Sequence, residues 1–188
     1  QLIDILDRYG VKATFFVVGS WVDKYPESVK ALSDAGHEVM NHSNTHAHYP
    51  QLTADEVIAD LNACNDKIET VTGVRPTLVR MPYGDYDDKS VQAARSIGME
   101  PIQWDVDSLD WKEIPADEIT QRVTSKVGPG SIVLFHNAAL HTPEALPSIL
   151  EQLTQEGYTF VPISQLILTG NYSIRDVLLF PTMKPLDK

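Results

Sequence analysis

The sequence has one cysteine, few basic residues and no long apolar run among its 188 residues. Because Cys64 has no second cysteine to pair with, no internal disulfide can form, and the fold depends on its hydrophobic core. Lysine and arginine number 15 against 26 aspartate and glutamate, which gives a net charge of -11 and argues against a nucleic-acid partner. No stretch approaches the roughly 20 apolar residues of a membrane span, and no signal peptide is visible.

What is present indicates one globular domain. Hydrophobic residues make up 43% and charged residues 22% of the chain, close to the average for globular proteins. The acidic balance is compatible with a neutral polymer or a small molecule as a partner, and it also serves solubility. We expect residues 1–170 to form the domain and residues 171–188 an irregular tail. The first residue is Gln1 rather than Met and opens an amphipathic helix, so we expect that an N-terminal segment is missing.

Hydrophobic periodicity predicts strands and helices in alternation along the chain. The expected strands are apolar runs of the kind buried on both faces of a parallel sheet, at residues 13–18, 37–40, 76–80, 101–105, 131–135 and 159–161. The expected helices are 2–9, 26–35, 53–71, 87–97, 116–127 and 143–156, and the third opens with a capping box at Thr53 and Glu56. This order is typical of right-handed βαβ units, and it leaves open whether the sheet is open or closed into a barrel.

Polar residues follow four of these strands, at the end of the sheet where loops converge in parallel α/β folds. After the second strand, the run His-Ser-Asn-Thr-His places His42 and His46 four residues apart. If this run is helical, both rings share one face and can bind one metal ion, whereas His48 points elsewhere. Taken alone, the run could equally be a pair of loop histidines that bond locally.

The other three clusters have structural alternatives of the same kind. Arg80 precedes a Met-Pro-Tyr-Gly turn, where it could hold a carboxylate or form an ordinary salt bridge. Three acids and Trp111 fall within residues 105–111, a composition that suits either sugar contact or the entry to a helix. His136 ends an apolar strand and is either a structural histidine or a general acid that Asp110 holds in one tautomer.

Taken together, the four clusters resemble the polysaccharide deacetylases of the NodB-homology type, carbohydrate esterase family 4. The resemblance covers nearly the whole chain and rests on four motifs in the family's order. These are His-Ser-x-x-His at 42–46, Arg-x-Pro-Tyr-Gly at 80–84, Asp-Ser-x-Asp-Trp at 107–111 and Leu-x-His at 134–136. The resemblance implies an α/β fold, a distorted (β/α) barrel that lacks its first strand in this chain.

The resemblance also implies a role for each matching residue. His42 and His46 would bind the metal, which is usually zinc or else another divalent transition metal. Arg80 would orient a catalytic base, the backbone N–H of Tyr83 would hold the oxyanion, and Asp110 would tether His136 as the general acid. The substrate would lie against side chains that match the family's binding groove and acetyl pocket, namely Pro82, Trp111 and Leu134.

One motif of the family is absent from these residues. Its Thr-Phe-Asp-Asp sequence supplies the base and the third metal ligand from a strand before the first helix, whereas Asp4 and Asp7 belong to that helix. We therefore expect this chain alone to be inactive unless a complementing N-terminal fragment supplies the strand. The competing hypotheses are a metal-binding or glycan-binding pseudoenzyme, a non-haem iron oxygenase and a purely structural α/β domain.

The activity that the resemblance implies is metal-assisted removal of N-acetyl groups from a polysaccharide. Peptidoglycan N-acetylglucosamine is the first expected substrate, ahead of chitin oligomers and acetylated xylan. Because the family acts mostly outside the membrane, the resemblance implies an extracellular or cell-wall location in a bacterium.

Overall fold

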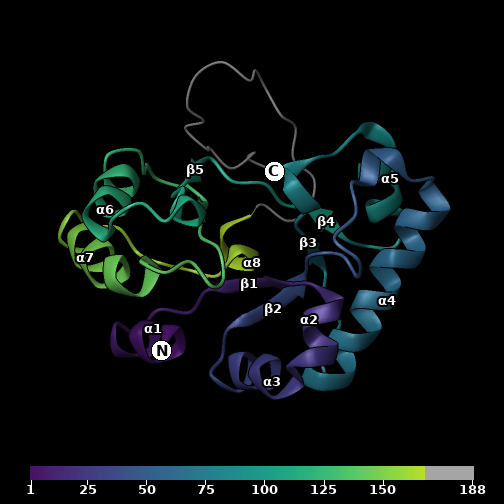
Figure 1. The fold of residues 1–188 in the computed structure, drawn as a ribbon, viewed down its shortest axis with the longest axis horizontal. Helices are drawn as coiled ribbons and strands as arrows, with labels where there is room; N and C mark the ends of the chain where they lie inside the picture. The colour runs from purple at the N-terminus through teal and green to yellow at the C-terminus, as the bar shows by residue number, and fades with distance from the viewer. Residues whose placement is uncertain (168–188) are drawn as a thin grey trace, which may run out of the picture.

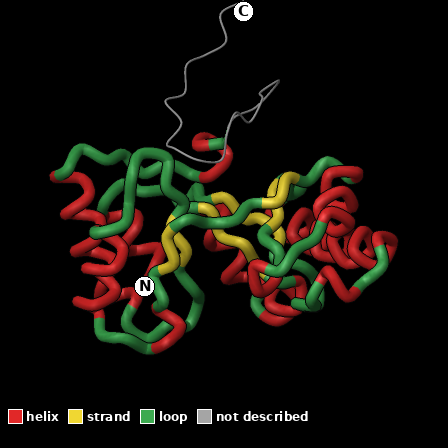
Figure 2. The backbone as a smooth tube through the Cα atoms, turned by 90° about the horizontal axis from the view of Figure 1, so that it is seen from above, coloured by secondary structure: helices red, strands yellow, loops and turns green. Residues whose placement is uncertain are grey.

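The computed structural model describes residues 1–167 as helices arranged on both sides of a central set of short strands (Figures 1 and 2). The helices are α1 (Leu2–Arg8), α2 (Gly19–Lys24), α3 (Pro26–Asp34), α4 (Ala54–Thr72), α5 (Asp88–Ser96), α6 (Ala116–Thr124), α7 (Thr142–Gln155) and α8 (Ile163–Leu166). The strands are β1 (Thr14–Val17), β2 (Glu38–Asn41), β3 (Leu78–Val79), β4 (Glu100–Pro101), β5 (Val106–Asp107) and β6 (Val133–Leu134). Three short 3-10 turns are η1 (Tyr49–Gln51), η2 (Pro82–Gly84) and η3 (Asp110–Lys112).

The described strands form two parallel sheets. The first has the order β1-β2-β3-β4, and the second pairs β5 with β6. Val17 lies opposite Asn41, and Asn41 lies opposite Val79, so β1, β2 and β3 end at the same level. The residues that follow these strands therefore meet at one edge of the sheet, as the sequence predicts.

Two groups of helices bury the apolar faces of the sheets. On one side, α2, α3 and α4 pack on β1 and β2 around Val29 and Ile68, both fully buried. On the other side, α6 and α7 pack on β5 and β6 around Ile119 and Ile149. Cys64 belongs to the first group, where burial raises the pKa of its thiol to about 12, so an inert core thiol is the consistent interpretation.

Helix α4 begins where its sequence predicts. The Thr53 hydroxyl accepts the backbone N–H of Glu56 at 3.3 Å, and the Glu56 carboxylate accepts the N–H of Thr53 at 2.8 Å. This reciprocal pair satisfies two amide groups that the first turn leaves without helical partners, and it confirms the predicted capping box. The helix ends at Gly73, whose φ of 76° is the left-handed conformation that glycine adopts without steric cost.

Three expectations about the elements were wrong. The predicted strand 101–105 is divided between β4 and β5, because β4 pairs with β3 and β5 pairs with β6. Residues 159–161 are extended but pair with no strand among the described residues, and α2 was not predicted. The predicted tail, residues 171–188, lies outside the described residues. Residues 1–167 contain no helix that is long and apolar enough to cross a membrane.

Candidate active site

The structure brings most of the predicted site residues to the wall of one cavity. This cavity has a volume of about 880 Å³ and runs from the ends of β1 and β6 down between these two strands. The predicted residues on its wall are His42, His46, Arg80, Tyr83, Trp111, Leu134 and His136. Pro82 is buried in the turn beside the cavity, and Asp110 is buried behind His136.

The two histidines of the 42–46 run meet without a helix, which corrects one premise of the sequence argument. The run is an irregular loop after β2, in which Ser43 and His46 adopt positive φ angles of 73° and 58°. The ring centroids of His42 and His46 lie 5.0 Å apart at an interplanar angle of 77°. Two imidazoles that each bind one metal ion through a nitrogen at about 2.1 Å have centroids about 5 Å apart, so the pair fits a shared divalent metal.

The protonation state of the pair also suits metal binding. His42 donates its Nδ1–H to the backbone oxygen of Arg80 at 2.7 Å, which leaves Nε2 as the free donor atom. Burial, opposed by the hydrogen bond to the Arg80 carbonyl and assisted by the nearby His46, lowers the pKa of His42 to about 4. Burial also lowers the pKa of His46. Both rings are therefore neutral at pH 7, the form that binds a metal ion.

No third ligand joins the pair among residues 1–167, which contain no group of three His, Cys, Asp or Glu side chains placed to hold a metal ion. His48 is one residue that the sequence left without a role. Its ring stacks on Tyr83 with centroids 3.9 Å apart, and its Nδ1 bonds to Asp85 at 2.9 Å. His48 therefore supports the neighbouring turn, while the metal fit rests on His42 and His46 alone.

Arg80 is a buried cation that pairs with no carboxylate in the described part of the chain. Its side chain is 8% exposed and makes long hydrogen bonds to the carbonyl oxygens of Ile102 (3.4 Å) and Gln103 (3.3 Å). The guanidinium also lies over the rings of Phe16 and Trp104, at 4.4 and 5.5 Å from their centroids. Burial lowers the pKa of Arg80 to about 10, so it remains charged at pH 7 and would gain from an anionic neighbour.

The turn η2 holds Tyr83 in a strained backbone conformation. Tyr83 has a φ of 61°, a conformation that costs a non-glycine residue roughly 1–2 kcal/mol. Gln103 steadies the turn by donating its Nε2–H to the carbonyl of Gly84 at 2.9 Å. The Tyr83 side chain is 61% exposed and meets the His46 ring edge to face at 4.5 Å, so the turn lies directly beside the histidine pair.

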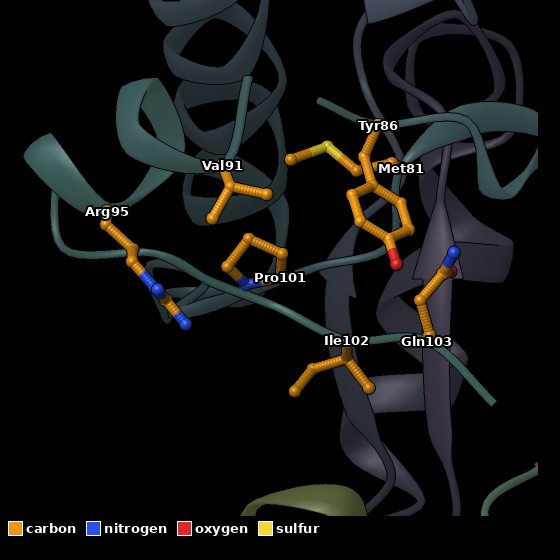
Figure 3. A pocket seen from close by; sticks show the side chains of 7 residues that line it. All are labelled: Met81, Tyr86, Val91, Arg95, Pro101, Ile102 and Gln103. Carbon is orange, nitrogen blue, oxygen red and sulfur yellow. The ribbon is translucent and has the colours of Figure 1, made fainter. Parts of the chain in front are cut away.

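A smaller pocket of about 280 Å³ lies near this turn, and Gln103 is one of the residues that line it (Figure 3). Figure 3 shows the rings of Tyr86 and Pro101 facing its interior, with Met81 and Val91 above them. The pocket is lined by residues of both α5 and β4, and none of the predicted site residues lines it.

His136 is held by a fully buried carboxylate. Asp110 accepts the Nδ1–H of His136 at 2.8 Å, the backbone N–H of His136 at 2.9 Å and the hydroxyl of Thr142 at 2.6 Å. Burial alone would raise the pKa of Asp110, but these hydrogen bonds outweigh burial and lower it. The Asp110 contact fixes the tautomer of His136 and leaves Nε2 free to carry a proton into the cavity. Trp111, 54% exposed, stands beside this ring with centroids 6.5 Å apart.

Sequence reasoning missed two residues that support the site. Thr142 is the first residue of α7 and reaches Asp110 across 32 positions of sequence. Gln103 follows β4 and reaches the Gly84 carbonyl. Neither residue belongs to a motif, and only the packing of α7 and β4 against the site turns reveals them.

Comparisons with known proteins identify the family of this chain. The model of the polysaccharide deacetylase family matches residues 1–102. The peptidoglycan-N-acetylmuramic acid deacetylase PdaC of Bacillus subtilis is 39% identical over 166 residues, which are 88% of this chain and 35% of that protein. A peptidoglycan-N-acetylglucosamine deacetylase of Bacillus cereus is 31% identical over 174 residues, 90% of this chain and 63% of that protein. The chain thus spans from about a third to under two thirds of these relatives.

One similar crystal structure is described as a family 4 carbohydrate esterase pseudoenzyme from Bacillus anthracis. It is 38% identical, with a TM-score of 0.85, and the match covers 88% of this chain and 58% of that one. A mutant of the same protein is described as having restored enzymatic activity. On the sequence match, the fold and these structural relatives, the chain belongs to the polysaccharide deacetylase family, with the α/β fold of carbohydrate esterase family 4.

Proposed function

We propose that this chain carries the site of a metal-dependent hydrolase that removes N-acetyl groups from a cell-wall polysaccharide, with peptidoglycan N-acetylglucosamine as its first substrate. One observation supports this activity above the others. His136, fixed by Asp110, faces the same cavity as the neutral pair His42 and His46 and the turn at Tyr83. An iron oxygenase or a structural domain has no use for a tethered general acid beside an oxyanion turn.

In this proposal each residue of the site has its own role in amide hydrolysis. A divalent metal bound at His42 and His46 would supply Lewis acidity to this chemistry. The N–H of Tyr83 stabilises the tetrahedral oxyanion, a contribution of about 3 kcal/mol for one well-placed donor. His136 gives its Nε2 proton to the leaving amine, which is otherwise too basic to depart. Trp111 and Leu134 hold the sugar ring and the acetyl methyl group.

In this proposal the base and the third ligand come from outside the described residues, and the shape of the cavity supports a strand as their source. β1 and β6 each lie at an edge of their sheet. Because Val17 accepts the N–H of His42 on the β2 side, the backbone groups of Phe16 point to the open edge of β1. The cavity between β1 and β6 is lined mostly by apolar side chains, which suits a strand buried on both faces.

Charge complementarity adds to this argument. Arg80 lies over the ring of Phe16 at that open edge and pairs with no carboxylate among residues 1–167. We therefore propose that a complementing segment adds a parallel strand between β1 and β6 and ends in carboxylates beside Arg80 and His46. The other partner in the proposal is the N-acetylated glycan, and nucleic acid is not among the partners.

A second function is favoured by one comparison. The Bacillus anthracis relative is described as a pseudoenzyme, and the described residues here hold no carboxylate beside the histidine pair. In this alternative the chain binds a metal or a glycan without catalysis. An extracellular or cell-wall location is part of either proposal, supported by the names of the peptidoglycan-acting relatives.

Acetate release tests the proposal. The chain is assayed alone and with an apolar strand ending in two aspartates, supplied as a peptide or fused before Gln1, on peptidoglycan fragments, chitin oligomers and acetylated xylan. We expect acetate only with both the strand and Zn²⁺, with loss of release in EDTA and a drop of about 100-fold or more in His136→Ala. If the strand and Zn²⁺ both bind and no acetate appears, the pseudoenzyme is the correct alternative.

A further inference from the structure

The histidine loop between β2 and η1 holds a shape that its own backbone does not favour. Two non-glycine residues, Ser43 and His46, occupy the left-handed region with φ of 73° and 58°. Each costs roughly 1–2 kcal/mol and persists only where neighbouring groups hold it in place. The loop carries both predicted metal ligands, so whatever holds it also sets the separation of their rings.

One carboxylate on α4 makes three of the contacts that hold this loop. Asp60 accepts the backbone N–H of Asn44 at 2.7 Å, the hydroxyl of Thr45 at 2.7 Å and the hydroxyl of Tyr49 at 2.8 Å. Asn44 and Thr45 are two of the three residues between His42 and His46. Asp60 therefore fastens the segment between the ligands to the middle of a 19-residue helix.

Contacts inside the loop complete the clamp without replacing Asp60. The Oδ1 of Asn41 accepts the N–H of Ser43 at 2.6 Å, and the hydroxyl of Ser43 accepts the N–H of His46 at 2.8 Å. These two bonds set the local turns. Asp60 alone among the three acceptors belongs to α4, so it places the whole loop relative to the rigid part of the fold.

Asp60 itself touches neither the cavity nor the rings. It is absent from the cavity wall, and it forms no cluster with His42 and His46 that could hold a metal ion. Asp60 therefore acts on the site through the residues that it holds, Asn44, Thr45 and Tyr49. Hydrogen-bonded residues that orient metal ligands typically change metal affinity 10–100-fold when they are altered.

We propose that Asp60 is a positioning residue that sets the spacing of His42 and His46 for one divalent metal ion. This inference rests on the proposed function and names how the fold prepares its metal site. Two results are expected. The affinity of His42 and His46 for a metal ion should depend on Asp60, and the metal-free loop should become more mobile when Asp60 is replaced.

The first experiment measures Zn²⁺ affinity by calorimetry for the wild type, Asp60→Asn and a matched control, Asp66→Asn. Asp66 lies on the same helix, and its carboxylate pairs with Arg75 at the surface at 2.7 Å. His42→Ala gives the background affinity of all other sites. We expect Asp60→Asn to weaken Zn²⁺ binding at least about tenfold, with Asp66→Asn within twofold of the wild type.

A second variant covers the case in which Asp60→Asn fails to fold. Thr45→Val removes one donor to Asp60 from an exposed position and leaves the carboxylate intact. Loss of one such hydrogen bond should weaken Zn²⁺ binding about threefold. Far-UV circular dichroism establishes that each variant is folded before its affinity is compared.

Apo protein provides a readout that does not depend on the metal site. In Asp60→Asn, amide exchange of Asn44 should speed up at least about tenfold, and the ¹⁵N ring signals of His42 and His46 should shift. If the wild type binds no Zn²⁺ at His42 and His46, the proposed metal site fails, and these apo signals alone decide the positioning role. Unchanged Asn44 exchange, or wild-type Zn²⁺ affinity in a folded Asp60→Asn, would overturn the inference.

Discussion

Replacement of Asp110 should destabilise the protein far more than replacement of a surface acid. The carboxylate is 0% exposed and accepts three hydrogen bonds, two from His136 and one from Thr142. In Asp110→Ala, the backbone N–H of His136 and the hydroxyl of Thr142 lose their acceptor, whereas the half-exposed ring of His136 can bond to water. Each such group costs roughly 1–3 kcal/mol, so the free energy of unfolding should fall by about 4 kcal/mol. Asp110→Asn keeps one acceptor oxygen and should lose about 2 kcal/mol.

Urea denaturation at pH 7, followed by far-UV circular dichroism, measures these losses. Asp107→Ala is the matched control, because its carboxylate is half-buried and accepts only the N–H of Leu109 at 2.9 Å; it should lose about 1 kcal/mol. Thr142→Val in the Asp110→Ala background should restore about 1 kcal/mol, since it removes a hydroxyl that already lacks an acceptor. A loss below 1 kcal/mol in Asp110→Ala, or strict additivity with Thr142→Val, would refute the reasoning.

Three further predictions follow from the site. In metal-free protein the pKa of His42 is about 4 against 6.5 in the unfolded chain. Between pH 6.5 and pH 4 only the unfolded state takes up a proton at His42. The free energy of unfolding should therefore fall by up to about 3 kcal/mol relative to pH 7. Urea titrations of His42→Gln, compared with the wild type, should lack this part of the pH dependence. Gly84→Ala would place a Cβ 2.7 Å from the Trp104 ring at a φ of +66°, and the free energy of unfolding should fall by about 3 kcal/mol. Gly98→Ala is the control: it has a φ of +77° but open space around it, and it should lose about 1 kcal/mol. Trp111→Ala should weaken binding of an N-acetylglucosamine oligomer about tenfold by calorimetry, while the free energy of unfolding changes by under about 0.5 kcal/mol. A loss of binding free energy matched by an equal loss of unfolding free energy would contradict a binding role.

The sequence predicted best those features of the fold that depend on residues close together along the chain. The capping box of Thr53 and Glu56 acts over three positions, and the start of α4 follows from it. The four motifs each follow a strand, so their meeting at one edge of the sheet could be predicted from strand order alone. The strand β1 could likewise be predicted from its own continuous apolar run, because that signal also depends only on neighbouring residues.

Features that depend on distant partners could not be read from the chain. β4 and β5 are separate strands because their partners differ: Glu100 bonds to Thr77, and Asp105 bonds to Ile132. Residues 159–161 have a strand sequence, yet they pair with no strand among residues 1–167. The loop of His42 and His46 resembled a helix by spacing, but contacts from α4 and β2 hold it in left-handed turns that no local pattern predicts.

Cobalt titration of metal-free protein, followed through the ring signals of ¹⁵N-labelled histidines, tests the shared metal most directly. At one equivalent of Co²⁺, the signals of His42 and His46 should shift and broaden together, His136 on the same cavity should broaden next, and His42→Ala should abolish all three effects. Co²⁺ that perturbs only one ring of the pair, or that binds His42→Ala as it binds the wild type, would contradict a metal centre at this site.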